Sequence, residues 1–179
     1  MLNPQVPPVT RNLELPIFYF EDDEYNSSLL LQRLEKRIKS IDDPKLIGIN
    51  TKFIPLNSKD QVTAIAERLD YAIILVDMNF GAGKETDGLH ILEEIQKRTE
   101  ANKECLFIVI ALTAYPDFEE LAYQRGADAF FEKGYGIRED ILTISSIYAE
   151  FITEIFLSSS PSKESLPSLK RFLEARKEF

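Results

Sequence analysis

The stretch Ala72-Ile-Ile-Leu-Val-Asp77 places one carboxylate directly after five apolar residues. Continuous apolar runs of this length are typical of parallel strands that are buried on both faces. Because the carboxyl ends of parallel strands form the ligand crevice of α/β folds, a polar residue at such an end indicates a site. Polar residues follow other apolar runs of the chain in the same way: Glu21-Asp22-Asp23 after 17–20, Thr113 after 106–112, and Lys133 after 129–131.

These polar residues predict a shared metal and phosphoryl site. Three or more carboxylates, a hydroxyl and an ammonium would converge at one edge of the sheet. Carboxylates packed together repel each other unless a cation lies between them. Mg²⁺ is the expected cation because it accepts few protein oxygens and keeps several of its waters. The set therefore favours chemistry on a phosphoryl group.

Composition limits the class of protein. The chain has 179 residues with 44% hydrophobic content, which is enough for one well-packed domain and a tail. Its formal net charge of −9 argues against direct contact with nucleic acid, which requires Lys and Arg to neutralise phosphates. No apolar run reaches the roughly 18 residues that span a bilayer, and nothing resembles a signal peptide, so we expect no membrane contact and a cytoplasmic location.

Strand-like runs alternate with helical patterns along the chain. Repeated strand–helix units imply right-handed crossovers and helices on both faces of one parallel sheet. The sequence therefore predicts an α/β fold with a doubly wound five-stranded parallel sheet. The expected strands are 17–20, 52–56, 71–76, 106–112 and 129–132; the expected helices are 26–40, 59–69, one that opens at Asp87-Gly88, 116–124 and 138–157.

Over roughly residues 17–157 the chain resembles the receiver domains of two-component response regulators. This resemblance implies a flavodoxin-like (βα)₅ fold with strand order 2-1-3-4-5. It also implies phosphorylation of one aspartate by a partner histidine kinase or phosphotransfer protein. The motifs that carry it are Phe20-Glu21-Asp22-Asp23, Leu75-Val76-Asp77-Met78-Asn79, Asp87-Gly88-Leu89, Ala111-Leu112-Thr113-Ala114, Gly126-Ala127-Asp128 and Phe131-Glu132-Lys133.

The resemblance implies a role for each matching acidic residue. Asp77 would be the phosphoacceptor, a carboxylate nucleophile that attacks phosphorus in line. Asp22 would bind Mg²⁺ directly and Glu21 through water. Asp77 and the backbone carbonyl of Asn79 would complete the protein ligands.

The remaining matches imply the response to phosphorylation. Lys133 would pair with one phosphoryl oxygen and the Thr113 hydroxyl would donate to another. Phe130 stands where the family has an aromatic switch residue, although burial in the core is an equally open interpretation. A receiver promotes only its own phosphorylation and dephosphorylation, so we do not expect an enzyme acting on other substrates.

Two departures from the family pattern keep a second function open. Gly134 follows Lys133 where most receivers have proline, and the loop between Asp77 and Gly88 is longer than usual and lacks the customary proline. The alternative is a degenerate receiver that never accepts phosphate and serves as a protein-binding module.

Other phosphoryl and nucleophile chemistries lack residues that they need. A phosphatase of the haloacid dehalogenase type requires a second aspartate two residues after the nucleophile, where this chain has Asn79. His90 is the single histidine and is expected on the outer face of its helix, which argues against a phosphohistidine carrier. Cys105, the single cysteine, lies in an apolar run and is expected to be buried.

The C-terminal part carries the expectations about output. The helix expected at 138–157 would be about 30 Å long and has a wide apolar arc, which either packs on the core or pairs with a second chain in a homodimer. Residues 1–15 are expected to form a flexible arm, 16–157 the receiver domain and 158–167 a flexible Ser/Pro linker. Residues 168–179 would form a helical tail or the start of an effector region.

Overall fold

The computed structural model describes residues 13–43, 49–66, 69–79, 87–133, 137–175 and 177. Most of the expected N-terminal arm, the loop at 80–86 and Gly134 therefore lie outside the described residues. Among the helices that the structure describes, none is long and apolar enough to cross a membrane.

A five-stranded parallel sheet organises the described part of the chain, in the order β2-β1-β3-β4-β5. The predicted fold class and strand order are confirmed. The three central strands are almost fully buried because helices cover both of their faces, which explains their unbroken apolar sequences. The strands are β1 (Leu13–Phe20), β2 (Ile49–Leu56), β3 (Tyr71–Asp77), β4 (Leu106–Thr113) and β5 (Ala129–Glu132).

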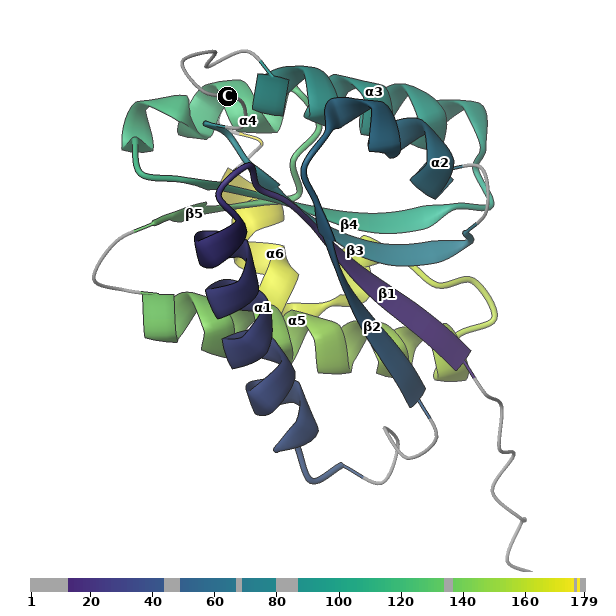
Figure 1. The fold of residues 1–179 in the computed structure, drawn as a ribbon. Helices are drawn as coiled ribbons and strands as arrows, with labels where there is room; N and C mark the ends of the chain where they lie inside the picture. Colours follow the sequence, from purple (N-terminus) through teal and green to yellow (C-terminus); the bar gives the residue numbers. More distant parts are fainter. Residues whose placement is uncertain are drawn as a thin grey trace, which may run out of the picture.

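Helices lie on both faces of the sheet (Figure 1). One hydrophobic cluster packs α1, α5 and α6 against one face, and a second cluster packs α2, α3 and α4 against the other. The helices are α1 (Glu24–Lys39), α2 (Val62–Ala66), α3 (Asp87–Ala101), α4 (Glu119–Gln124), α5 (Ile137–Leu157) and α6 (Pro167–Ala175).

Two element boundaries differ from the expectation in the first part of the chain. β1 begins at Leu13 rather than at 17, although Pro16 cannot donate a backbone hydrogen bond. Residues 13–16 pair with β2 alone, so this half of β1 is a sheet edge, where proline is tolerated. α1 begins at Glu24 because the Asp23 side chain caps it, accepting from the backbone N–H of Tyr25 at 2.9 Å.

The second helical segment is also shorter than expected. A single helix was predicted over 59–69, whereas the structure has a 3-10 turn at Lys59–Gln61 followed by α2 over Val62–Ala66. The apolar residues Val62 and Ile65 are nevertheless buried against the sheet, as their spacing predicted.

The C-terminal segment packs on the domain, and several residues of the stretch 158–167, expected to be a flexible linker, contact it. Leu166 is buried, and the Lys163 ammonium lies 2.7 Å from the shielded carboxylate of Asp128, which precedes β5. The Glu150 side chain of α5 accepts hydrogen bonds from the backbone and hydroxyl of Ser168 at the start of α6. Ser/Pro composition predicts flexibility only while a segment has no tertiary partners, and here it has several.

α6 covers part of the apolar arc of α5. Leu169 is fully buried, and Phe172 packs against Phe131 of β5 with the rings tilted and their centroids 5.0 Å apart. The large apolar residues that remain exposed on the described part of α5 are Leu142 and Leu157. The wide arc of α5 is thus largely buried within one chain.

Candidate phosphoryl and metal site

The predicted site residues meet at the carboxyl ends of neighbouring strands. Glu21 and Asp22 follow β1, Asp77 ends β3, Thr113 ends β4, and Lys133 follows β5. The order 2-1-3-4-5 makes β1 and β3 neighbours whose connections leave to opposite faces of the sheet. Ligands of open α/β sheets bind at such a switch point.

Three carboxylates form a compact cluster there. Glu21, Asp22 and Asp77 each offer one oxygen, and these oxygens lie within 4.8 Å of one another. Glu21 and Asp77 are buried, whereas Asp22 is exposed to solvent. The half-buried Lys133 ammonium bridges the two buried carboxylates, at 2.6 Å from Glu21 Oε2 and 2.8 Å from Asp77 Oδ2.

Burial and the Lys133 charge act differently on the two buried acids. Burial raises the pKa of Asp77 to about 6, although Lys133 opposes the shift. Burial alone would also raise the pKa of Glu21, but the hydrogen bonds from Lys133 and Tyr19 outweigh it and hold that pKa below its usual value. Of the two buried carboxylates, Asp77 is therefore the one whose negative charge the protein stabilises less well, and it gains more from a further cation.

The pKa of Asp77 predicts how pH changes the stability of the metal-free protein. Because its pKa rises from 3.8 to about 6 on folding, Asp77 adds stability at low pH that is lost as the pH rises through about 6. Burial, with a contribution from the nearby Glu139, raises the pKa of Asp140 to about 6 and gives the same sign. Between pH 5 and 7 we expect each acid to remove about 1 kcal/mol of unfolding free energy.

Urea unfolding at several pH values in the presence of a chelator checks this expectation. Asp77→Asn and Asp140→Asn should each flatten the loss of stability between pH 5 and 7. A wild-type protein whose unfolding free energy is constant or rises over this range contradicts the assignment.

Tyr19 belongs to the site, although sequence reasoning assigned it only to the apolar run of β1. Its hydroxyl donates to Glu21 Oε2 at 2.8 Å, and the Lys133 ammonium lies 5.7 Å from the centre of its ring. Alternate residues of a strand share a face, so Tyr19 and Glu21 point to the same side. The signal available in the sequence was a phenol in a buried strand, since a buried phenol needs a hydrogen-bond partner.

The backbone after β3 is held close to the acidic cluster. The N–H of Asn79 donates to Asp77 Oδ1 at 3.1 Å, and the Asn79 side-chain oxygen is buried without a hydrogen-bond partner among the described residues. Gly88, the second residue of α3, lies against this backbone, since a Cβ at position 88 would lie 2.5 Å from the Asp77 carbonyl oxygen. The pattern Asp87-Gly88 therefore reflects close packing of α3 on the site.

Thr113 and Phe130 occupy positions compatible with their predicted roles. Thr113 is fully buried, its hydroxyl accepts from the Tyr115 backbone N–H at 3.1 Å, and its carbonyl accepts from the Lys133 backbone N–H. Phe130 is 8% exposed and packs in the cluster on the α2, α3 and α4 side. The end of β4 thus anchors the backbone of Lys133.

His90 and Cys105, the residues of the discarded chemistries, have the burial that the sequence predicted. His90 is exposed on α3, as expected from its spacing. Cys105 is buried and donates to the Leu69 carbonyl at 3.2 Å.

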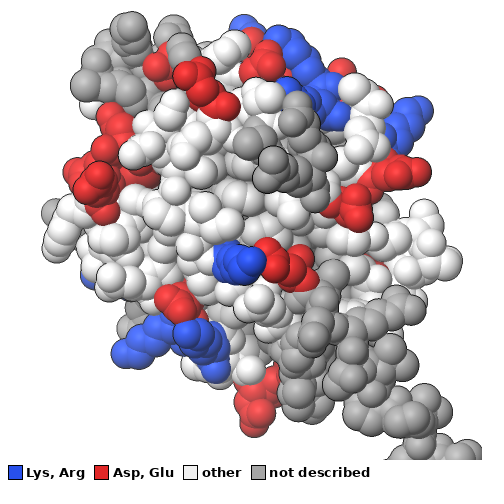
Figure 2. All heavy atoms as spheres, turned by 45° about the vertical axis from the view of Figure 1, so that its right-hand side comes forward, with Lys and Arg blue, Asp and Glu red and all other residues white. Residues whose placement is uncertain are grey.

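In the view of Figure 2, Lys and Arg side chains lie in scattered groups close to Asp and Glu, with uncharged residues between them.

The described donor set fits Mg²⁺. Carboxylate oxygens from two buried acids and one exposed acid suit a hard cation that keeps part of its water shell. The buried, unpartnered oxygen of Asn79 shows further acceptor capacity beside the cluster. The bridging position of Lys133 shows that the two buried carboxylates require positive charge between them.

No protein-family model and no curated protein sequence matches the chain. Solved structures do. A response regulator from Thermotoga maritima is 16% identical, with a TM-score of 0.53, and the match covers 76% of this chain and 99% of that one. The Mn²⁺-bound form of response regulator Rcp1 is 19% identical, with a TM-score of 0.54, and the match covers 82% and 99%.

A third similar structure is response regulator TrrA from Thermotoga maritima in complex with Mg²⁺-BeF. It is 16% identical, with a TM-score of 0.51, and the match covers 74% of this chain and 96% of that one. The fold of this chain is therefore that of response-regulator receiver domains.

Proposed function

We propose that this chain is a receiver domain that accepts a phosphoryl group on Asp77 from a histidine kinase or phosphotransfer protein, with Mg²⁺ as the required cation. The observation that carries the proposal is the cluster of Glu21, Asp22 and Asp77 with Lys133 on both buried carboxylates. Receiver-type neighbours described as Mn²⁺-bound and as a Mg²⁺-BeF complex support the choice of cation.

The transfer forms one bond and breaks another. An Asp77 carboxylate oxygen attacks phosphorus, and the bond between phosphorus and the donor's leaving atom breaks with its electron pair going to the leaving group. Glu21, Asp22, Asp77 and the Asn79 carbonyl would hold Mg²⁺, which would supply positive charge that lets an anionic donor approach.

The other side chains hold the product. Lys133, which pairs with Asp77 in this structure, moves its ammonium to a phosphoryl oxygen of the aspartyl phosphate. The Thr113 hydroxyl donates to another phosphoryl oxygen, and this contact transmits phosphorylation to Phe130. The chain catalyses only its own phosphorylation and dephosphorylation.

Phosphorylation by a small donor tests the cation requirement. Incubation with acetyl phosphate and Mg²⁺ should add one phosphoryl group to the intact mass. A chelator present from the start should prevent the adduct from forming, because two buried carboxylates and an anionic donor would then repel each other. Phosphorylation that proceeds equally well without a divalent cation would contradict the metal assignment. No adduct under any condition would favour the degenerate receiver that only binds protein.

A homodimer through α5 is the output that we propose, and α6 sets a condition on it. α6 covers part of α5 and β5 through Leu169 and Phe172, so pairing of two chains on this face requires α6 to move aside. We propose a cytoplasmic location for the chain and no direct contact with nucleic acid.

Release of α6 should therefore promote self-association. The variant Leu169→Ala/Phe172→Ala removes two of the contacts that hold α6 and should raise the dimer fraction measured by light scattering across a concentration series. Wild-type protein should shift in the same direction on phosphorylation at Asp77. Lys170→Ala is the control, because its exposed side chain pairs with Glu174 of the same helix. If the variant remains monomeric at every concentration, with or without phosphorylation, the dimer proposal is wrong and α5 only packs on the core.

A further inference from the structure

We infer that Tyr19 is a positioning residue for Glu21, which orients that carboxylate for the cation and keeps it hydrogen-bonded when Lys133 moves to the phosphoryl group. This inference rests on the proposed function. It concerns a residue within β1 that does not itself contact the reacting atoms.

The geometry around Glu21 carries the first step. Glu21 is 3% exposed, so its carboxylate depends on protein partners. Oε2 accepts from the Tyr19 hydroxyl at 2.8 Å and from Lys133 at 2.6 Å, and Oε1 accepts from the Asp23 N–H at 3.2 Å. A carboxylate has about four lone-pair positions, so about one remains, on Oε1. The three partners therefore select the oxygen and the direction that stay available for a cation or its water.

The second step follows from which partners can move. Lys133 carries its ammonium on a flexible side chain and is shared with Asp77. Tyr19 is 1% exposed in a central strand, in the hydrophobic cluster formed with α1 and α5, so its ring is fixed by packing. A tyrosine hydroxyl is protonated at neutral pH, so it remains a donor. When Lys133 leaves, Glu21 thus keeps one side-chain donor and is not left as an unsatisfied buried carboxylate.

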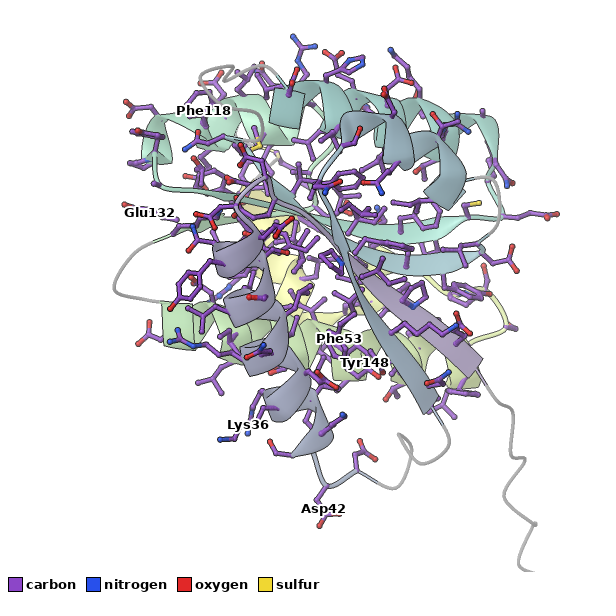
Figure 3. All side chains as sticks on the ribbon, viewed as in Figure 1. Lys36, Asp42, Phe53, Phe118, Glu132 and Tyr148 are labelled. Atoms are coloured by element: carbon purple, nitrogen blue, oxygen red, sulfur yellow. The ribbon has the colours of Figure 1, made fainter. Side chains whose placement is uncertain are left out.

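The chain offers a matched control for the test. Tyr148 is also 1% exposed and lies in the same hydrophobic cluster, but its hydroxyl pairs with Thr51. In Figure 3 Tyr148 lies beside Phe53 on the α5 side, away from Glu132, which precedes Lys133. Tyr148→Phe therefore removes a buried phenol hydroxyl without touching the site.

Calorimetric titration of the metal-free protein with Mg²⁺ alone measures the effect. Tyr19→Phe keeps the ring and should weaken Mg²⁺ affinity about tenfold, as loss of a partner that orients a ligand typically does. Tyr148→Phe should leave the affinity unchanged. With acetyl phosphate, Tyr19→Phe should raise the Mg²⁺ concentration required for half-maximal phosphorylation.

A double-mutant cycle with Glu21→Gln distinguishes positioning from a general loss of structure. Tyr19→Phe should have no further effect on Mg²⁺ affinity in the Glu21→Gln background, because its partner carboxylate is absent. An effect of the same size in both backgrounds, or wild-type affinity in Tyr19→Phe, would overturn the inference while leaving the proposed function intact. Wild-type protein that does not bind Mg²⁺ would overturn both.

Discussion

Replacement of Asp77 by asparagine is expected to reduce phosphorylation by acetyl phosphate to below detection, whereas the wild-type chain gains one phosphoryl group. Asparagine has nearly the same shape, but its neutral amide is a poor nucleophile toward phosphorus. The substitution also leaves Lys133 paired with Glu21 alone, so folding should be preserved while the acceptor is lost. Intact mass spectrometry of the two proteins after equal incubation measures the difference.

Asp23→Asn provides the matched control. Asp23 lies next to the cluster in sequence, but its side chain caps α1 and makes no contribution to the three-carboxylate group. Asparagine caps helices about as well as aspartate, so this variant should be phosphorylated like the wild type. An adduct that survives Asp77→Asn would place the acceptor elsewhere. No adduct on either wild type or variant would support the protein-binding module.

Replacement of Lys133 by alanine should lower the phosphorylation rate about 10²-fold while Mg²⁺ binding persists. Removal of one preorganised positive donor from a reacting oxyanion typically costs a factor of about 10²–10³. Mg²⁺ should still bind, because Glu21 and Asp77 lose the ammonium that neutralises them and gain from the cation. Single-turnover phosphorylation at saturating Mg²⁺, together with calorimetric titration of the metal, separates the two effects.

Thr113→Ala should behave differently from Lys133→Ala. The Thr113 hydroxyl is proposed to report the phosphoryl group to Phe130 and not to stabilise its transfer, so phosphorylation should remain measurable. The increase in dimer fraction that follows phosphorylation should be reduced. Loss of Mg²⁺ binding in Lys133→Ala would contradict the assigned division of roles, as would an unchanged dimer response in Thr113→Ala.

The site could be predicted from the sequence because each of its residues lies at the end of a strand. Apolar runs indicate which segments are buried, and the residue that follows each run must lie at the carboxyl edge of the parallel sheet. The placement of Asp77, Thr113 and Lys133 follows from this rule without knowledge of any side-chain contact. Phosphorylation itself depends on chemistry that only the proposed experiments measure.

Contacts near the site were harder to predict from the sequence, because several sequence patterns are compatible with more than one local structure. Asp23 is one of four adjacent acids, and only the geometry of the chain after β1 makes it the cap of α1. The first strand was expected at 17–20, yet β1 begins at Leu13 because residues 13–16 pair with β2, while β3 pairs only from Ile17 onward.

The sequence by itself determined the alternation of buried strands and amphipathic helices, and with it the strand ends that carry the acidic cluster, because periodicity and apolar run length are local properties. Tertiary structure alone decided which distant side chains pair. Lys133 reaches Glu21 across 112 positions, and Lys163 docks the C-terminal segment on Asp128 across 35. No local pattern predicts such pairings. The residues that flank a lysine in the sequence do not reveal whether its ammonium lies in water or beside a buried carboxylate. Burial makes the difference, because a carboxylate removed from water is stable only with a partner that the fold brings to it.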